Sequence, residues 1–326
     1  MGIADAWGRN IFYLRVSVTD RCNFRCAYCM PPTGVEWLSH REILSYEEIE
    51  RVIRVAARLG VYKVRITGGE PLLRKGLINF IRNVAAMPGI LDLAMTTNGG
   101  LLSEYAAKLK EVGLTRVNVS LDTLRPDRFK QLTGTDMLEK VLEGIEAACN
   151  TGLTPVKINV VVMKDLNEDE LADFARMTLT KPYQIRFIEH MPFRSAKGKN
   201  EKLVSVSRMK EILAAGGFPT LLPTTQGDGP ARVFRIPGAL GSVGFISPVT
   251  SHFCEECNRI RLTADGRIKP CLLSDQEHNI KTILRSGCTD QDLEDYLVKA
   301  VWDKPSQHLL DEATTELNQG MFKIGG

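Results

Sequence analysis

The sequence predicts an α/β protein in which strands and helices alternate, followed by a smaller region of a different type. From residue 11 to about 190, six short segments rich in β-branched residues are separated by helix-like segments. After about residue 195, polar and glycine-rich stretches introduce short strands with no helix between them. We therefore expect two domains, residues 1–220 and 221–326.

The six predicted strands of the first part are short and mostly bounded by turn or cap signals. They are residues 11–18, 62–67, 91–96, 116–121, 156–163 and 184–189. Because helix-like segments separate them, we expect parallel strands joined by right-handed crossovers. This order fits an open doubly wound sheet or part of a barrel. In either arrangement, ligands collect at the carboxyl ends of the strands.

The helices between these strands are recognised by how they begin and end. Ser45 with the following acidic residues predicts an N-cap, and Gly60 ends that helix. Asn167, followed by three acidic residues, is expected to cap another helix. Similar patterns give the predicted helices 103–112, 138–151, 167–177 and 207–215. In the second part, 232–236 and 242–246 are expected to form short strands of a hairpin region.

Composition places the chain among ordinary globular proteins and excludes several function classes. Of 326 residues, 44% are hydrophobic and 25% are charged. A net charge of +3 is too small to indicate a nucleic acid or an acidic membrane as partner. There is no run of 18 or more apolar residues and no apolar signal core near the start, so we expect a cytoplasmic protein that does not span a membrane.

The eight cysteines are distributed in a way that favours metal binding. Three lie within residues 22–29 and three within residues 254–271, whereas Cys149 and Cys288 stand alone. A disulfide framework would need an oxidising compartment, for which the sequence has no signal, and two odd-numbered groups pair poorly. We therefore expect three thiolates to bind metal at each group.

The first group, Cys22, Cys26 and Cys29, supplies three thiolates on one short loop. Soft thiolates favour iron–sulfur or zinc over hard cations. A closed zinc site needs a fourth ligand, and the closest histidine, His40, is eleven residues away. A four-iron cubane held by three cysteines keeps one iron open. The paired glycines of residues 68–71 follow the second strand, where they allow a ligand to approach bare backbone.

The second group has the spacing Cys-x2-Cys-x13-Cys, which suits zinc and iron–sulfur about equally. For zinc, His252 or His278 would be the fourth ligand. Arg259 and Arg261 alternate along a strand-like segment, so both can point to one face beside the cysteines. A structural zinc knuckle gives no reason for this pair, whereas a polyanion site does, because arginine binds phosphate with a rigid fork of donors.

Basic residues also recur on the predicted strands of the first part. They are Arg15, Lys63, Arg65, Lys157 and Arg186. Each by itself would commonly be a solvated or paired charge. Several of them on otherwise apolar strands indicate an anionic partner, because buried charges need one.

These motifs together resemble one family. The first cysteine run and the Gly-Gly-Glu-Pro segment are similar to the radical S-adenosylmethionine (SAM) superfamily. The whole constellation resembles the GTP 3',8-cyclase family of molybdenum cofactor biosynthesis. The matching segments are residues 13–15, 26–32, 65–71, 96–99, 118–123, 155–163, 186–192, 253–265 and 324–326.

The resemblance implies an incomplete (βα)6 TIM-type barrel of parallel strands, with a smaller C-terminal α+β region that closes its open side. It implies a lyase-type radical SAM enzyme that converts GTP to (8S)-3',8-cyclo-7,8-dihydroguanosine 5'-triphosphate. Its cofactors would be two [4Fe-4S] clusters and SAM. Its implied partners are GTP as substrate, an electron donor such as a flavodoxin or ferredoxin, a second copy in a homodimer, and a downstream cyclic pyranopterin monophosphate synthase.

The resemblance also implies roles for individual residues. The first cluster would be held by Cys22, Cys26 and Cys29, and the second by Cys254, Cys257 and Cys271. SAM would be contacted by Tyr28, Gly69, Ser120 and Met191. GTP would be bound by Arg15, Lys63, Arg65, Thr96, Lys157, Arg186, Arg259, Ile260 and Arg261. Catalysis would further involve Arg259, Arg261 and the terminal Gly325 and Gly326, a tail thin enough to enter the site.

Two other interpretations compete with this one. A radical SAM enzyme that modifies peptides or RNA would often carry more C-terminal cysteines or a more basic surface than this sequence has. A non-catalytic metal-binding adaptor would explain residues 254–271 but not residues 68–71.

Overall fold

The computed structural model describes the chain except for residues 1, 31–34, 192–200, 226, 309–320 and 325–326. The chain divides into two compact units, each built from segments that are distant in sequence. The first unit comprises Met1–Thr96, Lys108–Thr115 and Cys254–Gly326, and the second comprises Thr97–Ala107 and Arg116–Phe253. No single position in the chain separates these two units, so the domain boundary expected at residue 220 stays a prediction. Within the described ranges, no helix has the length and apolar character needed to cross a membrane.

The sheet of the first unit is centred on β3 (Tyr13–Ser17). β4 (Lys63–Thr67) lies parallel to β3 on one side, followed by β5 (Asp92–Thr97), as the alternation of strands and helices predicted. On its other side β3 pairs in parallel with β12 (Arg259–Leu262), which comes from the far end of the chain. The edge strands β13 (Arg267–Lys269) and β14 (His278–Asn279) run antiparallel. A small separate sheet pairs β1 (Ile3–Ala4) with β2 (Asn10–Ile11).

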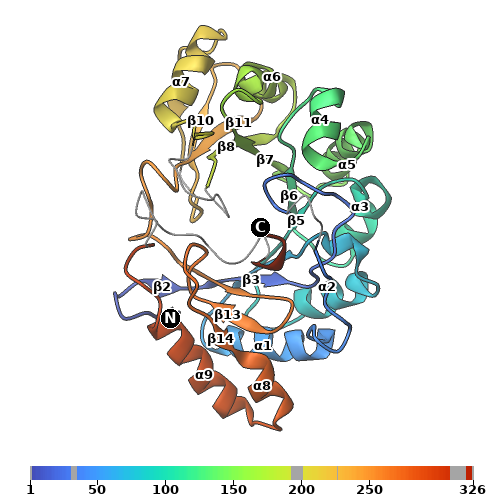
Figure 1. Cartoon of the computed structure of the whole chain (residues 1–326), viewed down its shortest axis with the longest axis vertical. Helices are drawn as coiled ribbons and strands as arrows, with labels where there is room; N and C mark the ends of the chain where they lie inside the picture. Colours follow the sequence, from blue (N-terminus) through green and yellow to red (C-terminus); the bar gives the residue numbers. More distant parts are fainter. Residues whose placement is uncertain (1, 31–34, 192–200, 226, 309–320, 325–326) are drawn as a thin grey trace. The chain divides into compact units, whose positions relative to one another are not determined.

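Helix α1 (Tyr46–Arg58) begins as predicted, because Ser45 and Glu48 form a reciprocal capping box. Two C-terminal helices that the sequence patterns did not predict, α8 (Ile280–Arg285) and α9 (Asp290–Trp302), belong to the same unit. Figure 1 shows α9 close to α1, and Asp290 at the start of α9 pairs with Arg51 and Arg58 of α1 at 2.8 and 2.7 Å. The unit also contains η1 (Pro71–Leu73), α2 (Leu77–Ala85) and α10 (Met321–Ile324).

The sheet of the second unit contains the three remaining predicted parallel strands. β6 (Arg116–Ser120), β7 (Lys157–Val162) and β8 (Gln184–Glu189) are parallel neighbours, and β11 (Ser242–Ile246) continues the sheet in parallel beyond β8. β10 (Arg232–Arg235) pairs antiparallel with β11, as expected for the hairpin region, and β9 (Leu222–Pro223) forms the edge. The α/β class with parallel strands is therefore confirmed.

The helices that accompany these strands follow the predicted positions closely, with α4 as an addition. They are α3 (Leu102–Glu111), α4 (Pro126–Thr133), α5 (Leu138–Asn150), η2 (Glu168–Glu170), α6 (Leu171–Thr180) and α7 (Val206–Ala215). In Figure 1, α4, α5 and α6 lie along the outer side of β6, β7 and β8. This arrangement leaves the carboxyl ends of the strands to carry loops.

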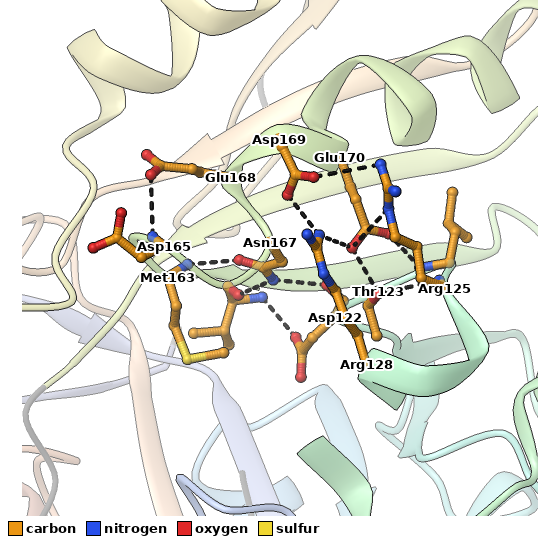
Figure 2. A network of polar contacts seen from close by, with 12 residues as sticks. Asp122, Thr123, Arg125, Arg128, Met163, Asp165, Asn167, Glu168, Asp169 and Glu170 are labelled. Carbon is orange, nitrogen blue, oxygen red and sulfur yellow. Dashed lines mark hydrogen bonds and ion pairs between the residues drawn. The ribbon is translucent and has the colours of Figure 1, made fainter. Parts of the chain in front are cut away.

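The predicted capping role of Asn167 is wrong. Its side chain makes no capping hydrogen bond. Instead its amide nitrogen donates to the carbonyl oxygens of Asp122 and Val161 at 2.7 and 2.9 Å, and its Oδ1 accepts from Met163 N at 2.8 Å (Figure 2). The side chain is buried and forms hydrogen bonds with backbone groups where β6 and β7 end. Satisfying these buried groups stabilises the fold more than capping one free N–H at the start of a helix would.

Candidate active site

The first cysteine loop follows β3 in the first unit. Cys22, Cys26 and Cys29 are partly buried, and none of them forms a disulfide with another described residue. The amides of Cys29 and Met30 both donate to Cys26 O, at 2.9 and 3.0 Å, which folds the loop into a tight turn. Phe24 N donates to Cys22 Sγ at 3.4 Å. A backbone N–H directed at sulfur stabilises the thiolate form. The sulfurs of the three cysteines therefore fit the ligands of an iron–sulfur cluster.

Gly69 brings the segment after β4 against this loop. Its amide donates to Thr19 O at 2.7 Å, and Glu70 N donates to Arg21 O at 2.8 Å. A β-carbon at Gly69 would lie 2.3 Å from Arg21 O, a distance that real side chains do not tolerate. Gly69 thus allows the backbone leading into Cys22 to approach closely, whereas the approach of a ligand expected from the paired glycines stays a prediction.

A set of basic side chains lies in register on one face of the first unit's sheet. Arg259, Tyr13 and Lys63 are direct neighbours across β12, β3 and β4. Two residues further along the same strands, Lys269, Arg261, Arg15 and Arg65 form a second row across β13, β12, β3 and β4. Alternate residues of a strand share a face, so both rows point the same way. We call this set the cation face: Tyr13, Arg15, Lys63, Arg65, Arg259, Arg261 and Lys269.

Tyr13 lies at the centre of the cation face and was not predicted as a site residue. Lys63 Nζ and the guanidinium carbons of Arg65 and Arg259 lie 5.1, 5.3 and 5.7 Å from the centre of its ring. Burial by itself raises the pKa of Tyr13, but the surrounding cations, Arg65 foremost, bring that pKa below its ordinary value. Its hydroxyl and the Oγ1 of Thr96 are both buried without a hydrogen-bond partner among the described residues.

The guanidinium groups of the cation face repel one another. Burial holds the pKa of Arg15 well below its ordinary value, and Arg261 and Arg65 lower it further. Burial and Arg259 lower the pKa of Arg261 to about 10. Asp92 Oδ2 approaches this face and lies 3.4 Å from Lys63 Nζ. An anion bound here would relieve the repulsion and satisfy the buried donors, so the face fits a polyphosphate.

The remaining predicted residues of the first unit belong to β12, the first cysteine loop and the C-terminal end of the chain. Ile260 is 2% exposed, and because it alternates with Arg259 and Arg261 its side chain points to the opposite face of the sheet. A ligand on the cation face would therefore meet only its backbone. Tyr28 is partly buried on the first cysteine loop. Gly325 and Gly326 lie outside the described residues, and the preceding Ile324 is buried.

The second cysteine group leads directly into β12. Cys257 N donates to Cys254 O at 3.1 Å, forming a tight turn two residues before Arg259. Burial raises the pKa of Cys254. Burial also acts to raise the pKa of Cys257, but Lys304 and Arg259 together bring it below the ordinary value of a thiol. Lys304 was missed by the sequence analysis, because nothing in its local pattern connects it with cysteines more than thirty positions earlier in the chain.

The geometry of the second group also bears on the zinc alternative. His278, one of the two candidate fourth ligands, places Nε2 3.5 Å from Asp303 Oδ2 and its ring edge-on to Tyr296. Across the part of the chain that the structure describes, no three His, Cys, Asp or Glu side chains are grouped so as to hold a single metal ion. The cations Lys304 and Arg259 beside the three thiols suit the net negative charge that a thiolate-ligated iron–sulfur cluster carries.

In the second unit, the predicted residues Ser120, Lys157 and Arg186 lie on three neighbouring parallel strands. Ser120, Asn159 and Arg186 form one row across β6, β7 and β8. Arg186 donates to Asn159 Oδ1 through Nε and Nη2, at 3.0 and 2.6 Å, which fixes the direction of the guanidinium. Lys157 precedes Asn159 on the same face of β7. Met191, two residues beyond β8, is partly buried.

Comparison with family models divides the chain into two parts. The model of the Radical SAM superfamily matches residues 16–178, and the model named Molybdenum Cofactor Synthesis C matches residues 183–310. The first match contains the first cysteine loop and Gly69, and the second contains the second cysteine group with Arg259, Arg261 and Lys304.

Relatives similar over the whole length carry the name GTP 3',8-cyclase. The protein from Heliobacterium modesticaldum is 51% identical over 325 residues, and that from Thermodesulfovibrio yellowstonii is 48% identical over 324 residues. Both alignments cover 99% of this chain and 99% of the relative. Among solved structures, Streptococcus suis SuiB aligns with a TM-score of 0.61 at 17% identity, over 90% of this chain and 66% of SuiB, which shows a shared fold.

Proposed function

Because the chain belongs to the GTP 3',8-cyclase family of the radical SAM superfamily, we propose that it converts GTP to (8S)-3',8-cyclo-7,8-dihydroguanosine 5'-triphosphate. This reaction is the first step of molybdenum cofactor biosynthesis and is of the lyase type. The observation that carries the proposal is the cation face, which continues directly into the second cysteine group. It places donors for a triphosphate beside three thiols suited to a cluster.

Two [4Fe-4S] clusters are proposed, the first on Cys22, Cys26 and Cys29 and the second on Cys254, Cys257 and Cys271. When held by Cys22, Cys26 and Cys29, the first cluster would supply, together with SAM, the radical chemistry needed to join C3' of GTP to C8 of its guanine. The chain's own task is to bind and orient both substrates and to exclude water from the reacting atoms.

SAM is proposed to contact Tyr28, Gly69, Ser120 and Met191. The partly buried aromatic ring of Tyr28 suits an adenine ring. GTP is proposed to bind Thr96 and the basic residues of the cation face that the sequence indicated, which are Arg15, Lys63, Arg65, Arg259 and Arg261. The buried Oγ1 of Thr96 has no hydrogen-bond partner among the described residues. Lys157 is a further residue proposed to bind GTP, and Lys63 and Arg186 are the proposed helpers. Arg259, Arg261 and the Gly325–Gly326 tail are proposed to act closest to the reaction.

We further propose an incomplete (βα)6 barrel whose open side is closed by the C-terminal α+β region, with domains 1–220 and 221–326. The parallel register of β3, β4 and β5, and of β6, β7 and β8, supports this interpretation. The protein is proposed to act in the cytoplasm as a homodimer. A flavodoxin or ferredoxin would supply electrons, and a cyclic pyranopterin monophosphate synthase would accept the product.

The test uses anaerobically reconstituted full-length protein with SAM, a strong reductant and GTP. We expect about eight irons per chain, as two four-iron clusters require, together with 5'-deoxyadenosine and a cyclised purine product. Arg261→Ala should retain the iron and lose cyclisation, whereas Arg208→Ala, an exposed arginine paired with Glu211, should behave as wild type. About four irons and one zinc per chain, or deoxyadenosine formed equally without GTP and with no cyclised product, would count against the proposal.

A further inference from the structure

Lys304 is a buried lysine whose ammonium joins two backbone segments of the second cysteine group. We call the segments that carry Cys254, Cys257 and Cys271 the arms of this group. It follows α9 and is 3% exposed. Its Nζ donates to Arg259 O at 3.1 Å and to Pro270 O at 2.5 Å. Arg259 lies two residues after Cys257, and Pro270 directly precedes Cys271. One side chain therefore fixes the backbone beside two of the three thiols.

A second buried cation holds the third arm, and the contrast between the two is informative. Arg9 Nη1 donates to Cys254 O at 2.8 Å, and its charge is matched by Asp5, whose Oδ2 lies 2.6 Å from Arg9 Nε. Lys304 forms no ion pair with a carboxylate among the described residues. A buried ammonium needs a compensating anion, and the two carbonyl oxygens that hold this one belong to Arg259 and Pro270, within two residues of Cys257 and Cys271.

The segment that carries Lys304 is held in place independently of its ammonium. Trp7 Nε1 donates to Lys304 O at 2.9 Å, and Arg9 donates to the carbonyl oxygens of Pro305 and Ser306 at 2.6 and 2.7 Å. The position of the ammonium is therefore determined by the fold around it, and a substitution of the side chain can remove the charge while leaving the segment anchored.

We propose that Lys304 is a positioning residue of the second iron–sulfur cluster: its ammonium clamps the arms that carry Cys257 and Cys271 and balances the negative charge of the cluster and its thiolates. This inference rests on the proposed function, which places a cluster on these cysteines. A fixed cation beside a cluster favours the reduced, more negative state, so the loss of the charge should lower the reduction potential.

The experiment uses the full-length chain with Cys22, Cys26 and Cys29 replaced by serine, which leaves the second cluster as the sole cluster. In this parent, K304M, K304Q and K304R are compared by iron content, by the rate of cluster loss to a chelator, and by potentiometric titration followed by electron paramagnetic resonance. K281M is the matched control, since Lys281 Nζ likewise donates to a backbone carbonyl, Glu42 O, at 2.8 Å, away from the cysteines.

For K304M and K304Q we expect about a tenfold shift of the reduction equilibrium toward the oxidised cluster, about 59 mV for a one-electron couple, and faster cluster loss. K304R and K281M should match the parent. K304Q retains a donor for the carbonyls, so the comparison does not depend on whether K304M folds. Parent-like potentials and loss rates in both uncharged variants overturn the inference. A parent that retains no iron instead overturns the second-cluster assignment, so the two failures are distinguishable.

Discussion

Glu170 is the centre of a polar network in the second unit, and the cost of removing its charge can be worked out from the structure (Figure 2). Its side chain is 0% exposed. The carboxylate accepts hydrogen bonds from Thr123 Oγ1 and Leu124 N, both at 2.7 Å, and from Arg128 Nη1 at 2.8 Å. Because Thr123 and Leu124 follow β6, the network holds the segment just beyond Ser120.

Glu170→Gln keeps the shape of the side chain but replaces one acceptor oxygen by a donor. Oε1 accepts from two donors and Oε2 from Leu124 N alone, so the amide nitrogen is expected to replace Oε2 and leave Leu124 N without an acceptor. An unsatisfied buried donor costs about 1–3 kcal/mol. The hydrogen bond to Arg128 also loses its charge assistance, but Arg128 is 30% exposed, so only a fraction of that loss applies. We take about 2.5 kcal/mol in total, which corresponds to a roughly 60-fold increase in local opening.

Hydrogen exchange followed by mass spectrometry on peptides covering residues 121–130 and 161–170 measures this opening directly. Asp169→Asn is the matched control, since Asp169 Oδ1 lies only 2.6 Å from the same Arg128 Nη1 but its side chain is 48% exposed. An exposed pair contributes less than about 1 kcal/mol, so the control should open less than about fivefold more than wild type.

The two variants separate burial from distance as the source of stability. If Asp169→Asn opened the segment as much as Glu170→Gln, the shorter ion pair would be decisive and our reasoning from burial would be refuted. Unchanged exchange in Glu170→Gln would refute it equally.

Three further predictions concern the first unit. Gly69→Ala should lower the iron content from about eight to about four per chain, because the new methyl group would lie 2.3 Å from Arg21 O beside the first cysteine loop; full iron retention in a metal assay would contradict this. Tyr13 should ionise at a lower pH than an ordinary tyrosine, since the cations around it stabilise the phenolate; an ultraviolet difference titration against Tyr13→Phe checks this, and ionisation at or above the ordinary pH would refute it. Arg15→Met should stabilise the ligand-free protein by about 1 kcal/mol, because it relieves the repulsion between guanidinium groups, and it should weaken GTP binding at least about tenfold. Denaturant unfolding measures the stability and calorimetry measures the affinity. A loss of stability together with unchanged affinity would show that the cation face does not bind the nucleotide.

Much of the fold could be predicted from local patterns. The parallel strands β3 to β8 and helix α1 are encoded by periodicity, by Ser45 as an N-cap and by glycine at the helix end, all of which act within a few residues. The alternation of Arg259 and Arg261 also indicated one shared face correctly. These features depend on the steric preferences of short segments, and so they can be read without knowing what lies beside them.

The features that could not be predicted depend on contacts between distant segments. No local pattern shows that β12 pairs with β3, and without that register Tyr13 is an ordinary buried aromatic. Asn167 is the residue type expected at a helix cap. In the folded chain its amide nitrogen instead donates to carbonyl oxygens near the ends of two strands, which are close to it only after folding. Lys304 has the local pattern of a surface lysine at a helix end, and only the folded chain brings it to Arg259 O and Pro270 O.

The pairing of β12 with β3 has a consequence for biosynthesis. Contacts in this region join residues as far apart as Arg9 and Ser306, which are 297 positions apart in the chain. The chain must therefore be synthesised at least as far as β12 before the cation face can be assembled, and closing so long a loop slows folding. During that interval the side of β3 that pairs with β12 remains an unpaired strand edge, which exposes the nascent chain to aggregation.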